Sequence, residues 1–219
     1  MNADNQLPTG WFVKAYLWAT TLLYGPLAWA YDAVAWLVSF GYWSRWRLDA
    51  LGFLKAGTVL ETGFGTGSLL VTLSEGGYDV TGLEISPQMH KVAGRRLSKM
   101  RLPVKRVRGR SEALPFMTHF FDNVVSTFPS NYILDERTMR EVFRIMRCNG
   151  RWVVVGLGVE FESGIKRLVT DLWMGRAADL IIPVLMQKMT AIGFQARRVD
   201  HQSDGYTLPV LIMEKNGDD

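Results

Sequence analysis

The sequence contains little cysteine, little histidine and little net charge. Cys148 is the only cysteine, which excludes an intramolecular disulfide and a metal site built from several cysteines. We interpret it as an idle thiol at a helix end, because Asn149-Gly150 follows it. The three histidines, His90, His119 and His201, give little indication of a catalytic role. A formal charge of +4 does not by itself indicate a polyanionic partner, and nothing requires an oxidising compartment, so we expect a cytoplasmic protein.

The N-terminal region also lacks a continuous membrane-spanning run. Between Lys14 and Asp32 lie 17 uncharged residues, but Gly25-Pro26 interrupts them. No basic region precedes this stretch, and no small-residue cleavage pattern stands out. We therefore expect neither a transmembrane helix nor a secretory signal here.

Aromatic residues are abundant in the same region. Six of the eight tryptophans fall within the first 46 residues, and Trp29, Trp36 and Trp43 recur every seven residues, as on one helical stripe. Two compatible interpretations remain open. The stripe packs onto the core or covers the active site as a lid; alternatively, it lies at a membrane surface, where tryptophan and tyrosine concentrate.

A basic run occupies the middle of the chain. Nine lysines and arginines and no acidic residue lie between Lys91 and Arg110. Such a run is usually a solvated helix face with its adjoining loop, but it could also attract an anionic membrane surface. Aromatic residues are absent from it, which argues against a nucleic-acid partner.

The chain divides near Gly57 into a helical N-terminal extension, residues 1–56, and a domain of residues 57–219 in which strands and helices alternate. This alternation predicts an α/β domain on a mainly parallel sheet. Strands are expected at 58–62, 78–85, 104–108, 121–128 and 151–157, and a closing hairpin at 195–201 and 206–214. Helices are expected at 68–75, 86–99, 135–147 and 162–192, the last with a break or fresh start at Pro183.

The first strand of this domain runs into a glycine-rich turn that opens a helix. Gly63, Gly65 and Gly67 let the backbone turn sharply and let a ligand approach closely, and the helix start favours an anionic group. The dinucleotide fingerprint would place its third glycine at Ser68, so the spacing argues against a nicotinamide or flavin enzyme. A carboxylate, Glu84, ends the next strand about 20 residues later, where it can accept hydrogen bonds from ribose hydroxyls.

Four motifs in this order resemble those of the class I S-adenosylmethionine-dependent methyltransferases, particularly the subgroup of quinone-biosynthesis and lipid-type enzymes. The resemblance covers residues 57–158 well. The motifs are Glu61-x-Gly63-x-Gly65-x-Gly67, Gly82-Leu83-Glu84-Ile85-Ser86-Pro87-Gln88-Met89, Ala113-Leu114-Pro115-Phe116, and Phe121-Asp122-Asn123-Val124-Val125-Ser126. The resemblance implies a Rossmann-like sheet of seven mostly parallel strands with flanking helices, and S-adenosylmethionine as cofactor.

The resemblance also implies roles for individual residues. Glu61 would lie near the cofactor's amino group, the three glycines along its methionine and ribose portion, and Glu84 at its ribose hydroxyls. The remaining residues expected at the cofactor are Phe64, Ile85, Met89, Arg110, Ser111, Glu112 and Ser126. Phe64 fills a variable position of the loop, where its side chain can alternatively pack inward.

Arg110 departs from the family pattern. Many members carry an aspartate there, which accepts a hydrogen bond from the adenine amino group, whereas an arginine has only donors. Ser111 or a backbone carbonyl would have to replace it, or the adenine is held more loosely.

The acceptor is expected beyond the fourth strand, where Asn131 and Tyr132 would orient it or cap the following helix. Methyl transfer is a direct displacement that requires alignment and exclusion of water, so no nucleophile or metal is needed. We expect a hydrophobic quinone or lipid precursor as acceptor, in the cytoplasm or at a membrane surface. The alternatives are a non-catalytic S-adenosylmethionine-binding protein and a nicotinamide-dependent reductase. The sequence leaves the acceptor atom and the oligomeric state open.

Overall fold

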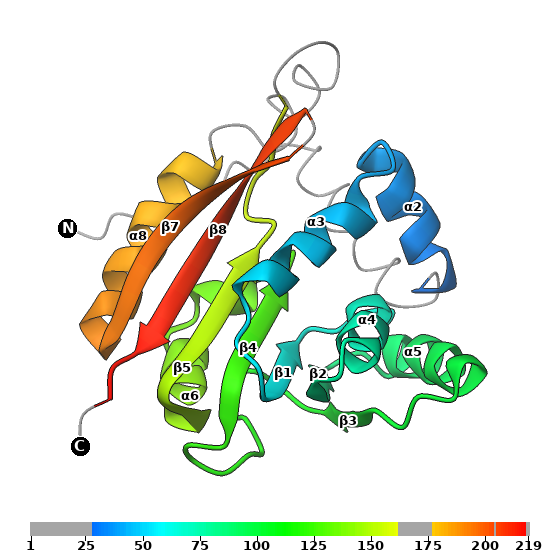
Figure 1. Ribbon diagram of the computed structural model, residues 1–219, viewed down its shortest axis with the longest axis horizontal. Helices are drawn as coiled ribbons and strands as arrows, with labels where there is room; N and C mark the ends of the chain where they lie inside the picture. The colour runs from blue at the N-terminus through cyan, green and yellow to red at the C-terminus, as the bar shows by residue number, and fades with distance from the viewer. Residues whose placement is uncertain (1–27, 162–176, 204, 218–219) are drawn as a thin grey trace, which may run out of the picture.

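The computed structural model describes residues 28–161, 177–203 and 205–217. Within these ranges strands and helices alternate from β1 onward, after a short helical N-terminal segment (Figure 1). The elements in chain order are η1 (Ala28–Ala30), α2 (Tyr31–Val38), α3 (Trp43–Asp49), η2 (Ala50–Phe53), β1 (Thr58–Thr62), α4 (Ser68–Glu75), β2 (Asp79–Glu84), α5 (Pro87–Met100), β3 (Lys105–Arg108), β4 (Phe121–Thr127), η3 (Asn131–Leu134), α6 (Glu136–Ile145), β5 (Met146–Val155), β6 (Glu160–Phe161), α8 (Ala177–Ile192), β7 (Phe194–Ser203) and β8 (Tyr206–Lys215).

The strands form one mixed sheet. Its order is β3-β2-β1-β4-β5-β8-β6, and β7 also pairs with β8. The pairs among β1 to β5 are parallel, and every pair with β8 is antiparallel. The predicted Rossmann-like α/β fold is confirmed, with eight strands rather than seven. The additional strand is the two-residue β6, which pairs with the start of β8 beyond the part that pairs with β5.

Helices cover both faces of the sheet (Figure 1). Side chains of β5 alternate between the two cores, because successive residues of a strand point to opposite faces. Val153 and Val155 pack with α3, α4 and α5, whereas Trp152 and Val154 pack with α6 and α8. The near-continuous burial of the central strands follows from this two-sided cover.

Local signals fix several helix starts. At α5, the Ser86 hydroxyl accepts from the Met89 N–H and Pro87 occupies the first helical position, as the sequence predicts. At α6, the Asp135 carboxylate accepts from the Arg137 N–H. Both caps place a loop at the carboxyl end of the preceding strand, which is where the candidate site lies.

Two predicted boundaries are wrong. The helix expected at 135–147 ends at Ile145, because the chain pairs with β4 from Met146 onward and takes up the Asn149-Gly150 turn within β5 as an irregularity of the register. Cys148 is therefore an exposed residue of a strand and not of a helix end. Pro183 does not break α8, which runs through it; the part of this prediction at 162–176 lies outside the described residues.

The tryptophan stripe is also wrong as a single helical face. Phe40 and Gly41 adopt positive φ angles of 53° and 84° and separate α2 from α3. Trp43 then packs inward, whereas Trp29 and Trp36 stay 74% and 60% exposed. Packing onto the core, one of the two interpretations of the stripe, therefore holds for Trp43 but not for Trp29 and Trp36.

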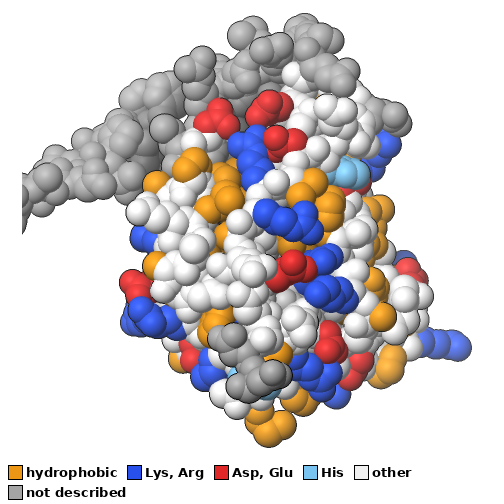
Figure 2. Space-filling view, turned by 60° about the vertical axis from the view of Figure 1, so that its left-hand side comes forward, with side chains coloured by type: hydrophobic (Ala, Val, Ile, Leu, Met, Phe, Trp, Pro, Cys, Tyr) orange, Lys and Arg blue, Asp and Glu red, His pale blue; other side chains and the backbone are white. Residues whose placement is uncertain are grey.

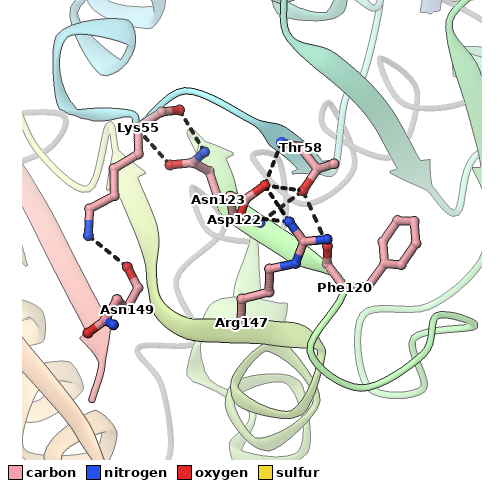
Figure 3. A network of polar contacts seen from close by, with 7 residues as sticks. All are labelled: Lys55, Thr58, Phe120, Asp122, Asn123, Arg147 and Asn149. Carbon is pink, nitrogen blue, oxygen red and sulfur yellow. Dashed lines mark hydrogen bonds and ion pairs between the residues drawn. The ribbon is translucent and has the colours of Figure 1, made fainter. Parts of the chain in front are cut away.

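A polar network ties the segment before β1 to the amino ends of β4 and β5 (Figure 3). The Asp122 carboxylate accepts from the Thr58 N–H and hydroxyl and pairs with Arg147. Burial opposes ionisation of Asp122, but these partners outweigh it and hold its pKa below the usual value. Asn123 exchanges two hydrogen bonds with the backbone of Lys55. Asp122 and Asn123, although part of a family motif, are thus structural residues at the sheet end opposite the glycine loop.

The face formed around β7 and α8 carries mixed charge (Figure 2). Arg198 of β7 lies within 4 Å of three carboxylates, those of Glu160, Asp179 and Asp200. Because cations and anions neutralise one another locally, this face offers no broad surface of one sign.

Candidate functional site

The glycine loop between β1 and α4 is held open above the end of β2. Gly63, Gly65 and Gly67 have φ angles of 72°, 52° and 74°, which other residues rarely adopt. The N–H groups of Gly63 and Phe64 donate to the Leu83 carbonyl at 2.7 and 3.3 Å. A Cβ at Gly65 would meet no heavy atom within 4 Å, so a ligand can reach the backbone there.

Glu84 closes the other side of this opening. Its side chain is buried, and its two oxygens accept from the Gly65 N–H at 3.1 Å and the Ser86 N–H at 2.8 Å. Each carboxylate oxygen has a second lone pair, so Glu84 can accept from two further donors such as neighbouring hydroxyls. The backbone bonds fix the carboxylate in place before any ligand arrives.

Glu61 lies at the carboxyl end of β1 and is only 2% exposed. Its Oε2 has no hydrogen-bond partner among the described residues. Burial raises the pKa of Glu61 to about 8, with Arg47 opposing and Glu84 adding to the shift. A buried carboxylate without a partner is costly, so the position suits a ligand that brings a cationic donor.

The N-terminal extension contacts the glycine loop directly. The Thr66 hydroxyl donates to Asp32 of α2 at 2.8 Å, and Arg96 of α5 donates to the Thr66 carbonyl and hydroxyl and pairs with Asp32. Three segments that are remote in sequence thus meet at one residue of the loop. None of the three was predicted as an individual site residue, although Thr66 lies within the glycine-rich motif.

The residues predicted on the acceptor side differ in their burial and in their hydrogen bonds. The Tyr132 hydroxyl donates to the Thr62 carbonyl at 2.9 Å and lies beside Gly63. Asn131 is exposed at the start of η3. Ser126 is fully buried, within hydrogen-bond distance of Thr62 and Trp152, so its hydroxyl joins strands beneath the site.

The residues predicted around the adenine also differ in their exposure. Ile85 is 52% exposed next to Glu84, where an aromatic ring could rest on it. Arg110 is largely exposed and pairs with Glu112 at 3.6 Å, whereas Ser111 is buried.

Two further predicted cofactor residues, Phe64 and Met89, are packed inside. The Phe64 ring lies against Gly82 and edge-on to His90 with ring centroids 4.8 Å apart. Met89 is fully buried in the first turns of α5. Phe64 therefore packs against β2, and neither side chain is exposed at the opening of the loop.

Within the described ranges, no group of three or more histidine, cysteine, aspartate or glutamate side chains is placed to hold a metal ion. No helix in these ranges is long and apolar enough to cross a membrane.

A sheet with this order, a glycine loop after β1 and an acidic residue at the end of β2 define the class I methyltransferase fold, and similarity to known proteins agrees. Residues 59–150 match the family described as methyltransferase domain. This part of the chain therefore matches a methyltransferase domain, and the predicted resemblance to the class I S-adenosylmethionine-dependent methyltransferases is confirmed.

Two relatives show the subgroup that the chain resembles. It is 33% identical over 139 residues to a demethylmenaquinone methyltransferase of Thermus thermophilus, covering 61% of this chain and 63% of that protein. It is 29% identical over 194 residues to the ubiquinone/menaquinone biosynthesis C-methyltransferase UbiE of Photorhabdus laumondii, covering 84% and 76%. The match with the Thermus protein thus spans less than two thirds of its length.

Solved structures share the fold at lower identity. A putative S-adenosylmethionine-dependent methyltransferase from Methanococcus maripaludis superposes with a TM-score of 0.64 at 18% identity, covering 88% of this chain and 93% of that chain. Geranyl diphosphate C-methyltransferase from Streptomyces coelicolor, solved with S-adenosylhomocysteine, gives 0.58 at 15%, covering 78% of each.

Proposed function

We propose that the protein transfers a methyl group from S-adenosylmethionine to a hydrophobic small molecule of the quinone or lipid-precursor type. The observation that carries this proposal is the pair of buried carboxylates around the open backbone of Gly65. Glu61 is without a hydrogen-bond partner among the described residues and suits the cofactor's ammonium, while Glu84 keeps free lone pairs for two ribose hydroxyls. These residues fit the cofactor's polar groups.

The residues of the chain would act by positioning. The cofactor supplies a methyl group already activated by its sulfonium, so no covalent enzyme intermediate is required. Glu61 would hold the amino-acid end of the cofactor and Glu84 its ribose, and the loop from Gly63 to Gly67 would exclude water from one side. Tyr132, fixed on the Thr62 carbonyl beside Gly63, would orient the acceptor together with Asn131.

Aromatic side chains support an apolar acceptor. Trp43 of α3 stacks on Phe128 with ring centroids 3.9 Å apart, and Phe128 follows the carboxyl end of β4. The indole N–H groups of Trp43 and Trp46 are buried and lack a hydrogen-bond partner among the described residues. An acceptor with an apolar ring and an oxygen would satisfy both features. In this proposal the N-terminal extension, residues 1–56, forms part of the acceptor pocket.

The direct test is transfer of labelled methyl from S-adenosylmethionine to a panel of demethylated quinones and lipid precursors. We expect label in at least one apolar ring acceptor and none in polar amines of similar size. Trp43→Phe, which keeps the ring and removes the N–H, should raise the KM for that acceptor about 5- to 50-fold, since one buried hydrogen bond is lost. S-Adenosylhomocysteine affinity should stay unchanged. Cofactor binding without transfer to any acceptor would contradict the proposed activity and support the non-catalytic alternative.

We further propose that the protein meets its acceptor at an anionic membrane surface. Exposed apolar side chains crowd α2 and its flanks, among them Trp36 and Leu37, and α5 next to it exposes Lys91, Arg95 and Lys99. The ion pair of Asp32 with Arg96 holds these two helices together. An amphipathic aromatic segment beside a basic helix is typical of interfacial binding.

Liposome flotation at low salt tests this surface. The wild type should float with anionic vesicles and much less with neutral ones. The double variant Trp36→Ser/Leu37→Ser should lose most of that binding, whereas Met117→Ser, an equally exposed apolar position, should not. Equal flotation of the double variant and the control would contradict membrane contact through α2.

A further inference from the structure

We propose that Arg47 of α3 binds the carboxylate of the cofactor's methionine portion, so that Arg47 and Glu61 together clamp its amino-acid end. This inference rests on the proposed function and adds a specificity residue from the N-terminal extension. Arg47 lies outside the motifs of the methyltransferase domain, which begin at β1.

Arg47 has unused hydrogen-bond donors. Its side chain is half-buried, yet among the described residues its guanidinium donates only to the Ser44 hydroxyl of its own helix, at 3.4 Å. It also lies over the Trp43 ring, 5.8 Å from the centroid. A guanidinium has five N–H donors, and one that is partly withdrawn from water normally pairs with a carboxylate or phosphate. Arg47 is therefore held in position with most of its donors free.

Arg47 lies beside the helix that follows the glycine loop. It lines a groove between α3 and α4, whose other lining residues are Ser44, Leu48, Ser68, Leu69 and Thr72. Ser68 is the first residue of α4, directly after the glycine loop, and Gly67 provides no side chain to cap this helix. The uncapped N–H groups and the helix dipole add to the attraction for an anion on this side of the loop.

Arg47 and Glu61 place a basic and an acidic group near each other. Arg47 is near enough to Glu61 that its charge lowers the pKa of that carboxyl, against the effect of burial. Burial in turn lowers the pKa of Arg47, an effect that Asp32 and Glu61 oppose and Arg96 reinforces. An amino-acid end carries an ammonium and a carboxylate on one carbon, so it requires a neighbouring anion and cation. Glu61 and Arg47 provide that arrangement, and binding would give each a partner.

Calorimetry with S-adenosylhomocysteine and 5′-methylthioadenosine tests the clamp. The second compound retains the adenine and ribose but lacks the amino-acid end. Arg47→Gln should weaken S-adenosylhomocysteine binding about 10- to 100-fold, as expected for a charge-assisted hydrogen-bonded pair. It should leave 5′-methylthioadenosine binding unchanged. Arg47→Lys should recover part of the loss, and Arg45→Gln, an exposed arginine of the same helix, should bind like the wild type.

The outcomes separate this inference from the proposed function. If the wild type binds no S-adenosylhomocysteine, the proposed function fails. If it binds and Arg47→Gln binds equally well, the clamp is wrong while the function stands. Equal weakening of both compounds would also overturn the clamp, because Arg47 would then only shape the site. Decarboxylated S-adenosylmethionine adds a check at a pH at which Glu61 is ionised in both proteins: Arg47→Gln should not weaken its binding there, whereas Glu61→Gln should.

Discussion

Glu61→Gln is expected to weaken binding of S-adenosylhomocysteine about 10- to 100-fold at pH 8.5, the range for a charge-assisted hydrogen bond in a buried site. The glutamine keeps the shape of the side chain but loses the charge that would meet the ligand's ammonium. In the wild type the affinity should rise about tenfold per pH unit up to about pH 8, because the carboxyl must ionise to bind. The variant should lack this slope. Calorimetry from pH 6 to 8.5 measures both, with Glu75→Gln, an exposed position of α4, as control.

The same substitution should stabilise the ligand-free protein at high pH. Burial raises the pKa of Glu61 from 4.5 to about 8, so the folded state binds this proton more tightly than the unfolded chain does. The resulting contribution to stability is fully present below pH 4.5 and is lost as the pH rises through 8. The difference in free energy of unfolding between Glu61→Gln and wild type should therefore shift in favour of the variant by a few kcal/mol between pH 5 and 8.5. A difference that does not change with pH would contradict the burial of an ionisable Glu61.

Glu84→Ala is expected to abolish measurable cofactor binding, with a loss of about 100-fold or more, because two hydrogen bonds to a charged acceptor disappear together. Unlike Arg47→Gln, it should weaken 5′-methylthioadenosine as strongly as S-adenosylhomocysteine, since both carry the ribose. It should also lower the free energy of unfolding by about 1–3 kcal/mol, because the Gly65 and Ser86 N–H groups lose their acceptor.

Asp79→Ala is the matched control for Glu84, because Asp79 is an exposed carboxylate at the other end of the same strand. It should change neither binding nor stability appreciably. Binding of S-adenosylhomocysteine by Glu84→Ala within threefold of the wild type would show that the ribose is held elsewhere.

Sequence patterns predict the parts of this site that depend on neighbouring residues. The glycines need positive φ angles, and the sequence places Glu84 at the end of the strand on which the loop rests. β1 also begins and ends where the pattern of apolar residues predicts. Ser86-Pro87 likewise defines the start of α5, because the capping hydrogen bond is made within the same turn.

The predictions fail where packing between segments that are distant in the sequence determines the bounds of a helix or strand. Pro183 removes one helical hydrogen bond from α8, but Ile182, Leu185 and Met189 on either side of it are buried against the sheet and keep the helix continuous. The strand that contains Cys148 begins early because its pairing with β4 competes with the helix.

The contribution of the N-terminal extension to the site also depends on packing between segments that are distant in the sequence. Asp32 reaches Thr66 and Arg96, and Arg47 is near enough to Glu61 to affect the pKa of that carboxyl, only because α2 and α3 pack against the domain that follows them. No spacing within the first 56 residues encodes those contacts. The regular spacing of the tryptophans even suggests one helix, whereas the left-handed turn at Phe40-Gly41 divides it.

The most direct test of the proposed cofactor site is a crystal structure of the full chain with S-adenosylhomocysteine. The account predicts the ligand in the opening at Gly65, with its ribose hydroxyls on Glu84 and its ammonium on Glu61. Its carboxylate should lie on Arg47. A structure with the ligand bound away from the glycine loop, or with the ammonium distant from Glu61, would contradict it.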